Sequence, residues 1–334
     1  MKEDCFMKKN KFACLLLSAV AVSTILSGCS STEAQGGEDP AENNQSVTSQ
    51  ADSQQQYKIG FATKYLAGSS FWTALTDAAE KALHEGDQYV LYNSQEDIPT
   101  QISQIEDLIA NEYDAIIVSC ADTEAINATL QEAKDAGIVV VTVDSSCTDD
   151  SLFYTEVMND NVTAATLCAE ELLKSMDRSG KAICYYDTMT DQSIAKGQTV
   201  QDMLEAEGIE VIHVDGLGHA DEALEKIEAA LQANPDVTAV HTYNGPSAEG
   251  AISALQSAGI LDKVMVTTID GSESDVTNLK AGKLHCFGTQ NPADMGRLAM
   301  ESIYKALAGE TLEKTTFCPA KLITKDNVDT FTPF

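Results

Sequence analysis

The sequence has 334 residues, of which 43% are hydrophobic and 22% are charged, as is typical of a globular protein. This length allows two lobes that each bury a core. Acidic residues outnumber basic ones by 52 to 21, and the formal net charge is −31. A chain this acidic repels phosphate backbones and anionic lipid head groups, so nucleic-acid binding is excluded. The only two arginines, Arg178 and Arg297, argue against a bidentate arginine clamp on an anionic ligand.

Residues 1–28 have the pattern of a bacterial export signal, in which a basic stretch at 8–11 precedes a short apolar run. The run is too short for a comfortable membrane span. It ends in Leu-Ser-Gly-Cys at 26–29, which resembles the lipobox of bacterial lipoproteins and implies that Cys29 is diacylated after cleavage. An ordinary signal peptide with an incidental cysteine is the alternative. The basic stretch directly follows Met7, so translation starts either there or at Met1.

Residues 29–56 are expected to form a flexible tether, because they are polar and contain almost no large apolar side chain. We therefore expect an exported protein that is lipid-anchored at the extracytoplasmic face of the cell membrane.

Six of the nine cysteines follow the tether: Cys120, Cys147, Cys168, Cys184, Cys286 and Cys318. Most lie in or beside apolar runs, which favours buried free thiols. No CxxC motif and no Cys/His metal spacing is present, so we expect no metal site. A disulfide between Cys120 and Cys147 is the alternative, because both follow predicted strands.

Strands and helices alternate along the chain after the tether. Apolar runs predict strands at 57–63, 89–92, 115–119, 139–143, 182–186, 211–214, 237–242 and 264–269. Helical spacing predicts helices between them, including one that begins at Ser69 or Ser70 and one at 124–136 that Gly137 ends. The alternation predicts an α/β fold with a doubly wound parallel sheet in each half.

A weak internal repeat links the two halves. The segments Ala-Gly-Ile at 136–138 and at 258–260 each precede an apolar strand that ends in an aspartate, Asp144 or Asp270. Ligands of open α/β sheets bind beyond the carboxyl ends of the strands. Two facing halves would therefore place Asp144 and Asp270 on opposite walls of a cleft.

We expect a binding protein rather than an enzyme. The sequence has no GxGxxG after its first strand and no P-loop, GxSxG or HExxH motif, and its five histidines have no metal spacing. Catalytic residues and a cofactor are therefore not expected. The side chains at strand ends instead mix aromatic rings with groups that bond hydroxyls, as a sugar requires. They are Phe71, Trp72, Ser119, Asp144, Asn244, Asp270 and Gln290.

From residue 57 onward the chain resembles the ribose- and galactose-binding type of periplasmic solute-binding protein, which has the type I fold. An ordered series of short motifs carries the resemblance. The series is Ser-Ser-Phe-Trp at 69–72, Thr-Val-Asp at 142–144, Asn-Asp-Asn at 159–161, Asn-Pro-Asp at 234–236, Tyr-Asn at 243–244, Ile-Asp-Gly at 269–271 and Gly-Thr-Gln-Asn-Pro at 288–292.

The resemblance implies two lobes, one of residues 57–159 with 291–318 and one of residues 160–290 with 319–334. Three crossings near 159–161, 289–291 and 318–321 would act as a hinge, and the lobes would close on a sugar. The closed form of a monomer would then dock on an ABC-type permease. The alternative is a receptor that reports a sugar, autoinducer, polyol or nucleoside to a membrane sensor.

The resemblance also implies residue roles. Phe71 and Trp72 would supply aromatic surface, whereas Asp144, Asn244 and Asp270 would bind hydroxyls. Gln290 would reach the ligand from a crossing, and His219 lies where relatives place an aromatic ring. The structural alternatives are helix packing for the aromatic residues, helix capping for Asp144, Asn244 and Asp270, a hinge hydrogen bond for Gln290 and a surface position for His219.

Two departures from the family pattern put ribose itself in doubt. Ser145 stands where many ribose binders carry Arg, and Lys196 aligns with another family Arg, with Gln192 one turn earlier. Lysine keeps the charge but lacks the planar fork, and a solvated surface lysine is the alternative. Lys64 and Ser69 would compensate from the first lobe.

Overall fold

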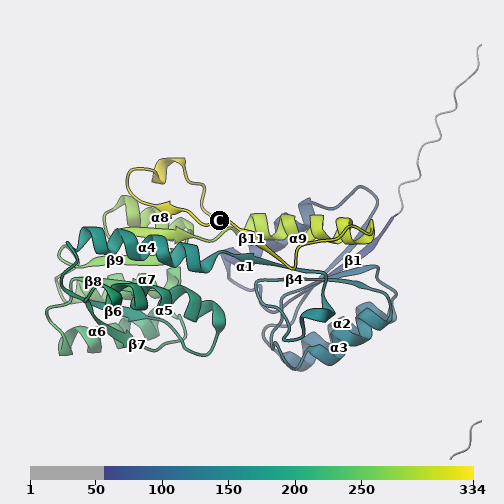
Figure 1. The fold of residues 1–334 in the computed structure, drawn as a ribbon, viewed down its shortest axis with the longest axis horizontal. Helices are drawn as coiled ribbons and strands as arrows, with labels where there is room; N and C mark the ends of the chain where they lie inside the picture. The colour runs from purple at the N-terminus through teal and green to yellow at the C-terminus, as the bar shows by residue number, and fades with distance from the viewer. Residues whose placement is uncertain (1–55) are drawn as a thin grey trace, which may run out of the picture. The chain divides into compact units, whose positions relative to one another are not determined.

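A computed structural model describes residues 56–334, so the export signal, Cys29 and the tether up to residue 55 lie outside the described residues. The described chain forms two six-stranded sheets, each at the centre of one lobe (Figure 1). The first sheet contains β1 (Lys58–Thr63), β2 (Gln88–Asn93), β3 (Ala115–Val118), β4 (Val139–Val143), β5 (Thr155–Asn159) and β11 (Thr315–Cys318). The second contains β6 (Lys181–Tyr185), β7 (Glu210–Val214), β8 (Ala239–Thr242), β9 (Met265–Asp270), β10 (Cys286–Thr289) and β12 (Leu322–Ile323).

Both sheets are wound in the same way. Their strand orders are β11-β5-β4-β3-β1-β2 and β12-β10-β9-β8-β6-β7. Every neighbouring pair is parallel except that of β10 with the edge strand β12. The predicted α/β class with a doubly wound sheet in each half is therefore confirmed. The chain passes between the sheets after β5, after β10 and after β11.

The helices of the first lobe are α1 (Ser70–Lys81), α2 (Ile98–Ala110), α3 (Asn127–Asp135) and α9 (Pro292–Leu307). Figure 1 shows α1 and α9 on one side of the sheet and α2 and α3 on the other. Gly296 of α9 lies against the backbone of α1, where a Cβ atom would overlap the carbonyl oxygen of Leu75. This close approach fixes α1, whose first turn carries Phe71 and Trp72.

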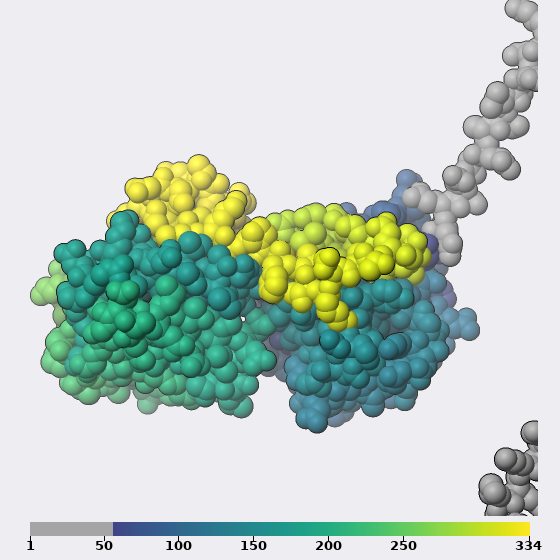
Figure 2. Space-filling view, in the orientation of Figure 1, coloured from purple at the N-terminus to yellow at the C-terminus, as the bar shows by residue number. Residues whose placement is uncertain are grey.

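The helices of the second lobe are α4 (Asn161–Ser175), α5 (Asp191–Ala206), α6 (Ala220–Ala233), α7 (Gly245–Ser257) and α8 (Glu273–Lys280). Helix α4 packs beside α5, and α6 packs beside α7. After β12 the chain forms a short 3-10 turn, η2 (Val328–Thr330), and Figure 2 shows this C-terminal segment, in yellow, on the surface of the second lobe. None of the helices within residues 56–334 is both long and apolar enough to span a membrane.

Local chemistry sets several element boundaries. Ser69 caps α1 by accepting a hydrogen bond from the Trp72 amide, which confirms the predicted start. The helix predicted at 124–136 begins only at Asn127, because its first residues form turns. The strand predicted at 237–242 likewise begins at Ala239.

The six cysteines within the described residues are buried and form no disulfide. The preference for buried thiols is therefore confirmed, and the alternative disulfide between Cys120 and Cys147 is wrong. Burial in apolar surroundings raises the pKa of both thiols, which keeps them protonated and unreactive.

Candidate functional site

The carboxyl ends of the strands in both sheets border one cavity of about 670 Å³. The first lobe contributes the segment after β1, the first turn of α1 and the residue after β4. The second lobe contributes the loops after β7, β8, β9 and β10 and one side chain of α5. Nine of the residues predicted for the site line this cavity: Ser69, Phe71, Trp72, Asp144, Lys196, His219, Asn244, Asp270 and Gln290. Lys64 lines it as well.

An ion pair marks the wall formed by the first lobe. The Nζ atom of Lys64 lies 3.1 Å from Oδ2 of Asp144, 3.1 Å from Oγ of Ser145 and 5.4 Å from the centre of the Trp72 ring. Asp144 directly follows β4 with a φ of 65°, in the left-handed region that aspartate tolerates. Its carboxylate caps none of the helices within residues 56–334. The carboxylate thus faces the cavity with a cation beside it.

Two aromatic rings lie beside this ion pair. Phe71 and Trp72 meet edge to face, with ring centroids 5.3 Å apart. Trp72 is 8% exposed and packs into the core of the first lobe, whereas Phe71 is half-buried. Trp72 therefore packs into the core, as the alternative of helix packing requires, and it also borders the cavity.

Asp270 and Asn244 form the facing wall on the second lobe. Oδ2 of Asp270 accepts a hydrogen bond from the Gly245 amide at 2.9 Å. Asn244 caps α7 by accepting a bond from the Ser247 amide, and its Nδ2 donates to the Gly218 carbonyl at 3.2 Å. Capping, the alternative considered for these residues, is therefore what Asn244 does, although it also borders the cavity.

Lys196 projects from α5 into the same cavity. It is only 8% exposed, and its Nζ lies 5.5 Å from the centre of the Tyr243 ring. Its position excludes the alternative of a solvated surface lysine. Burial lowers the pKa of Lys196, while the charges of Asp270 and Asp144 act in the opposite direction.

Burial also perturbs the acid that faces this lysine. It raises the pKa of Asp270 to about 7, and the charge of Asp275 adds to the rise. The Gly245 amide and the charge of Lys196 oppose it. The ionisation of Asp270 therefore changes close to neutral pH.

Three of the predicted residues lie outside the cavity lining: Ser119, Ser145 and Gln192. The buried Ser119 has its Oγ 3.3 Å from Oγ of Ser145, which donates to the Cys120 carbonyl at 2.8 Å. Gln192 accepts a hydrogen bond from Asn161, the residue to which Gln290 donates at 3.2 Å. The hinge hydrogen bond considered for Gln290 is therefore present, and Gln290 also borders the cavity.

His219 is exposed at the start of α6, as its surface alternative requires, and it too borders the cavity.

The cavity also contains residues that the sequence did not indicate. Tyr65 follows Lys64 after β1, so its place at a strand end was an available signal. Glu96, Leu217, Glu249 and Phe334 lie in loops, in a helix or at the end of the sequence, and no local pattern pointed to them.

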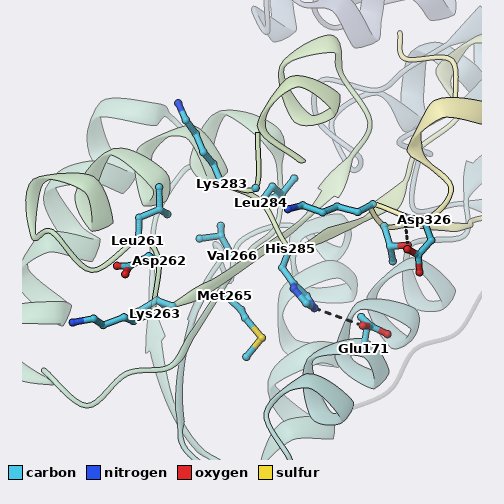
Figure 3. Close-up of a pocket in the computed structure, with 14 residues that line it drawn as sticks. Glu171, Leu261, Asp262, Lys263, Met265, Val266, Lys283, Leu284, His285 and Asp326 are labelled. Atoms are coloured by element: carbon cyan, nitrogen blue, oxygen red, sulfur yellow. Dashed lines mark hydrogen bonds and ion pairs between the residues drawn. The ribbon is translucent and has the colours of Figure 1, made fainter. Parts of the chain in front are cut away.

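A different cavity, of about 410 Å³, lies at the amino ends of β9 and β10 and contains none of the predicted residues (Figure 3). Lys263, Lys283 and Asp262 border it, and Nε2 of His285 lies 3.6 Å from a carboxylate oxygen of Glu171. Its lining has charged side chains of both signs but no Phe, Tyr or Trp, and all of its residues come from the second lobe. The first cavity, where polar and aromatic groups from both lobes converge, is therefore the candidate site.

Within residues 56–334, no three His, Cys, Asp or Glu side chains are grouped as metal ligands would be.

Comparison with known proteins then places the chain in a family. The periplasmic binding protein domain matches residues 59–311. The ribose import binding protein of Bacillus subtilis (strain 168) is 27% identical over 280 residues, which cover 83% of this chain and 90% of that protein. A D-ribose/D-allose-binding protein of Pseudomonas aeruginosa is 26% identical over 275 residues, which cover 79% and 86%.

A solved structure agrees with these matches. An ABC transporter solute-binding protein from Bacillus halodurans, with bound myo-inositol, superposes with a TM-score of 0.76 at 25% identity, over 82% of this chain and 96% of that one. The chain therefore belongs to the periplasmic binding protein domain family, in its type I form, and this family consists of solute-binding proteins and not of enzymes.

Proposed function

We propose that this chain is an extracytoplasmic lipoprotein that captures a small sugar or cyclic polyol in the first cavity and delivers it to an ABC permease. The cavity lining carries the proposal, because aromatic rings lie on one wall and carboxylates with an ammonium group on both. Sugars present hydroxyls that need such groups and C–H faces that pack on rings. The ligands named for the relatives fit this class: ribose, allose and myo-inositol.

Each wall has a distinct role in the proposal. Asp144 and Asp270 accept hydrogen bonds from ligand hydroxyls on opposite sides of the cavity, and Lys196 donates a hydrogen bond to a ligand oxygen from its position on α5. Lys64 supplies the positive charge that many relatives place at position 145, since its ammonium group lies between Asp144 and Ser145. Two flexible lysines in place of guanidinium forks favour a solute other than ribose.

Closure of the lobes completes the proposed binding step. The proposed lobes are residues 57–159 with 291–318 and residues 160–290 with 319–334, joined by crossings near 159–161, 289–291 and 318–321. Because a solute contacts both walls only when the lobes approach each other, it stabilises the closed form that a permease would recognise. The Gln290–Asn161 bond lies where two of these crossings meet.

A thermal-shift screen of the full exported chain against pentoses, hexoses, inositols and nucleosides tests the ligand class. A solute at 100 times its dissociation constant should add about 2.7 kcal/mol to the free energy of unfolding. Asp144→Ala should remove that shift, whereas the exposed Asp262→Ala, which borders the other cavity, should keep it. No shift with any sugar or inositol would contradict the proposal, and a shift with nucleosides alone would replace its ligand class.

The anchor is a separate part of the proposal, carried by the resemblance of residues 26–29 to a lipobox. Cys29→Ser should release the protein from the membrane fraction and abolish incorporation of labelled fatty acid. Size-exclusion chromatography with light scattering should give the mass of a monomer. Membrane retention of the Cys29→Ser chain would remove the lipid anchor from the proposal.

A further inference from the structure

The C-terminal segment lies on the surface of the second lobe (Figure 2), and its residue Phe334 borders the first cavity. Val328 is buried, and the ring of Phe331 meets that of Phe287 edge to face at 5.3 Å. The amide of Phe334 donates to the Gly271 carbonyl at 3.3 Å. These contacts place Phe334 next to the strand end that carries Asp270.

The residue after Asp270 leaves room for this seat. Gly271 has a φ of 127°, which residues other than glycine rarely adopt. A Cβ atom there would lie 3.0 Å from Cζ of Phe331 and 3.5 Å from Cε1 of Phe334. Both the backbone conformation and the limited space at position 271 therefore favour glycine. The loop that follows Asp270 thus accommodates the C-terminal segment.

From this seat the ring of Phe334 reaches the first lobe. It meets the ring of Phe71 edge to face, with centroids 5.9 Å apart and an interplanar angle of 81°. Phe71 in turn meets Trp72 in the same manner at 5.3 Å. All three side chains border the cavity. A side chain held by the second lobe thus continues an aromatic row that begins in the first.

We propose that Phe334 is a ligand-retaining residue that closes the rim of the cavity by packing on Phe71. The inference rests on the proposed function and adds to it the class of solute that is held best: a ring with an apolar C–H face rather than a linear polyol. Because the Phe334–Phe71 contact joins the lobes, it must break before the solute leaves. Phe334 should therefore slow release more than it speeds capture.

A double-mutant cycle of Phe71→Ala, Phe334→Ala and both together tests this inference in the full exported chain. The first readout is the melting temperature without solute, which reports the contact itself. The second is the rate of release of a sugar found in the screen, followed by Trp72 fluorescence. An edge-to-face pair is expected to change affinity roughly two- to tenfold, mostly through faster release, and the double variant should lose less than the two single losses combined.

Two further variants separate retention from a general loss of aromatic surface. Phe334→Leu keeps an apolar side chain and should restore part of the affinity. Tyr154→Ala removes an exposed aromatic ring that does not border the cavity and should leave release unchanged. Additive effects in the binding cycle, or a Phe334→Ala chain that releases sugar at the wild-type rate, would overturn the inference. If the wild-type chain bound no sugar, the proposed function would fail by itself, and additive melting shifts would still refute the Phe334–Phe71 contact.

Discussion

Replacing Asp270 with Asn should make the protein more stable and a weaker binder at pH 8. Burial and the charge of Asp275 raise the pKa of Asp270 from an ordinary 3.8 to about 7. Between these values the folded chain holds a proton that the unfolded chain has lost, so the free energy of unfolding falls as the pH rises from about 4 to about 7. Asn resembles the neutral acid, and its oxygen can still accept the bond from the Gly245 amide.

The size of the effect follows from the shift. About 3 pKa units correspond to about 4 kcal/mol for an isolated carboxyl group. Part of the pKa shift comes from repulsion between Asp270 and Asp275, which both residues share. We therefore expect Asp270→Asn to raise the free energy of unfolding by about 2 kcal/mol at pH 8 and the melting temperature by about 4 °C. A hydrogen bond to a charged acceptor contributes about 1.5–3 kcal/mol, so the affinity for the solute should fall roughly 10- to 150-fold at the same pH.

Scanning calorimetry without solute and titration calorimetry with it, at pH 5, 6.5 and 8, measure both effects. At pH 5, where the wild-type acid is protonated, the two chains should differ little in either property. The exposed Asp262→Asn serves as a control that changes neither. A lower melting temperature for Asp270→Asn at pH 8 would refute the reasoning about burial, and unchanged affinity at pH 8 would remove Asp270 from the site.

Three further predictions concern the same lobes. Gly296→Ala should lower the melting temperature by several degrees, because the added methyl group would lie 2.9 Å from the Ala79 amide nitrogen and overlap the α1 backbone. An unchanged melting temperature would mean that α1 and α9 can move apart at little cost in stability. Trp72 is the only tryptophan, so its emission should change when a sugar binds, and Trp72→Phe should abolish the signal; a silent Trp72 would place the solute elsewhere. Lys196→Met should weaken binding at least about tenfold without lowering the melting temperature, because burial already disfavours the lysine charge. Loss of stability instead of binding would give Lys196 a structural role.

The sequence predicted strands best where both faces of the sheet are covered. The run at 115–118 is apolar throughout and forms β3, whereas β5 alternates buried and partly exposed residues and went unpredicted. Strands β11 and β12 are short edge strands without a strong apolar run. Periodicity carries too little information in such segments, because neighbouring strands rather than the segment itself decide the pairing.

For the site, strand ends predicted which loops converge but not which side chains turn inward. Asp144 and Asp270 border the cavity as predicted, yet Ser119 and Ser145 bond to each other outside its lining, and Ser145 also donates to the Cys120 carbonyl. Phe334 reaches the cavity only because the folded second lobe holds its backbone. Such a contact depends on tertiary structure and leaves no local pattern in the sequence.

The pairing of β5 with β11 has a consequence for the order in which the chain folds. Glu156 stands opposite Thr315, so this edge of the first sheet stays open until the ribosome has made residue 318. Strands β6 to β10 are complete before then and have only each other to pair with. Both sheets therefore wait for a strand from the end of the chain, the first for β11 and the second for β12, so neither sheet is complete until residues 315–323 have been made. In a chain that is exported as proposed, we expect this delay to keep both sheets incomplete while the leading half passes through the membrane.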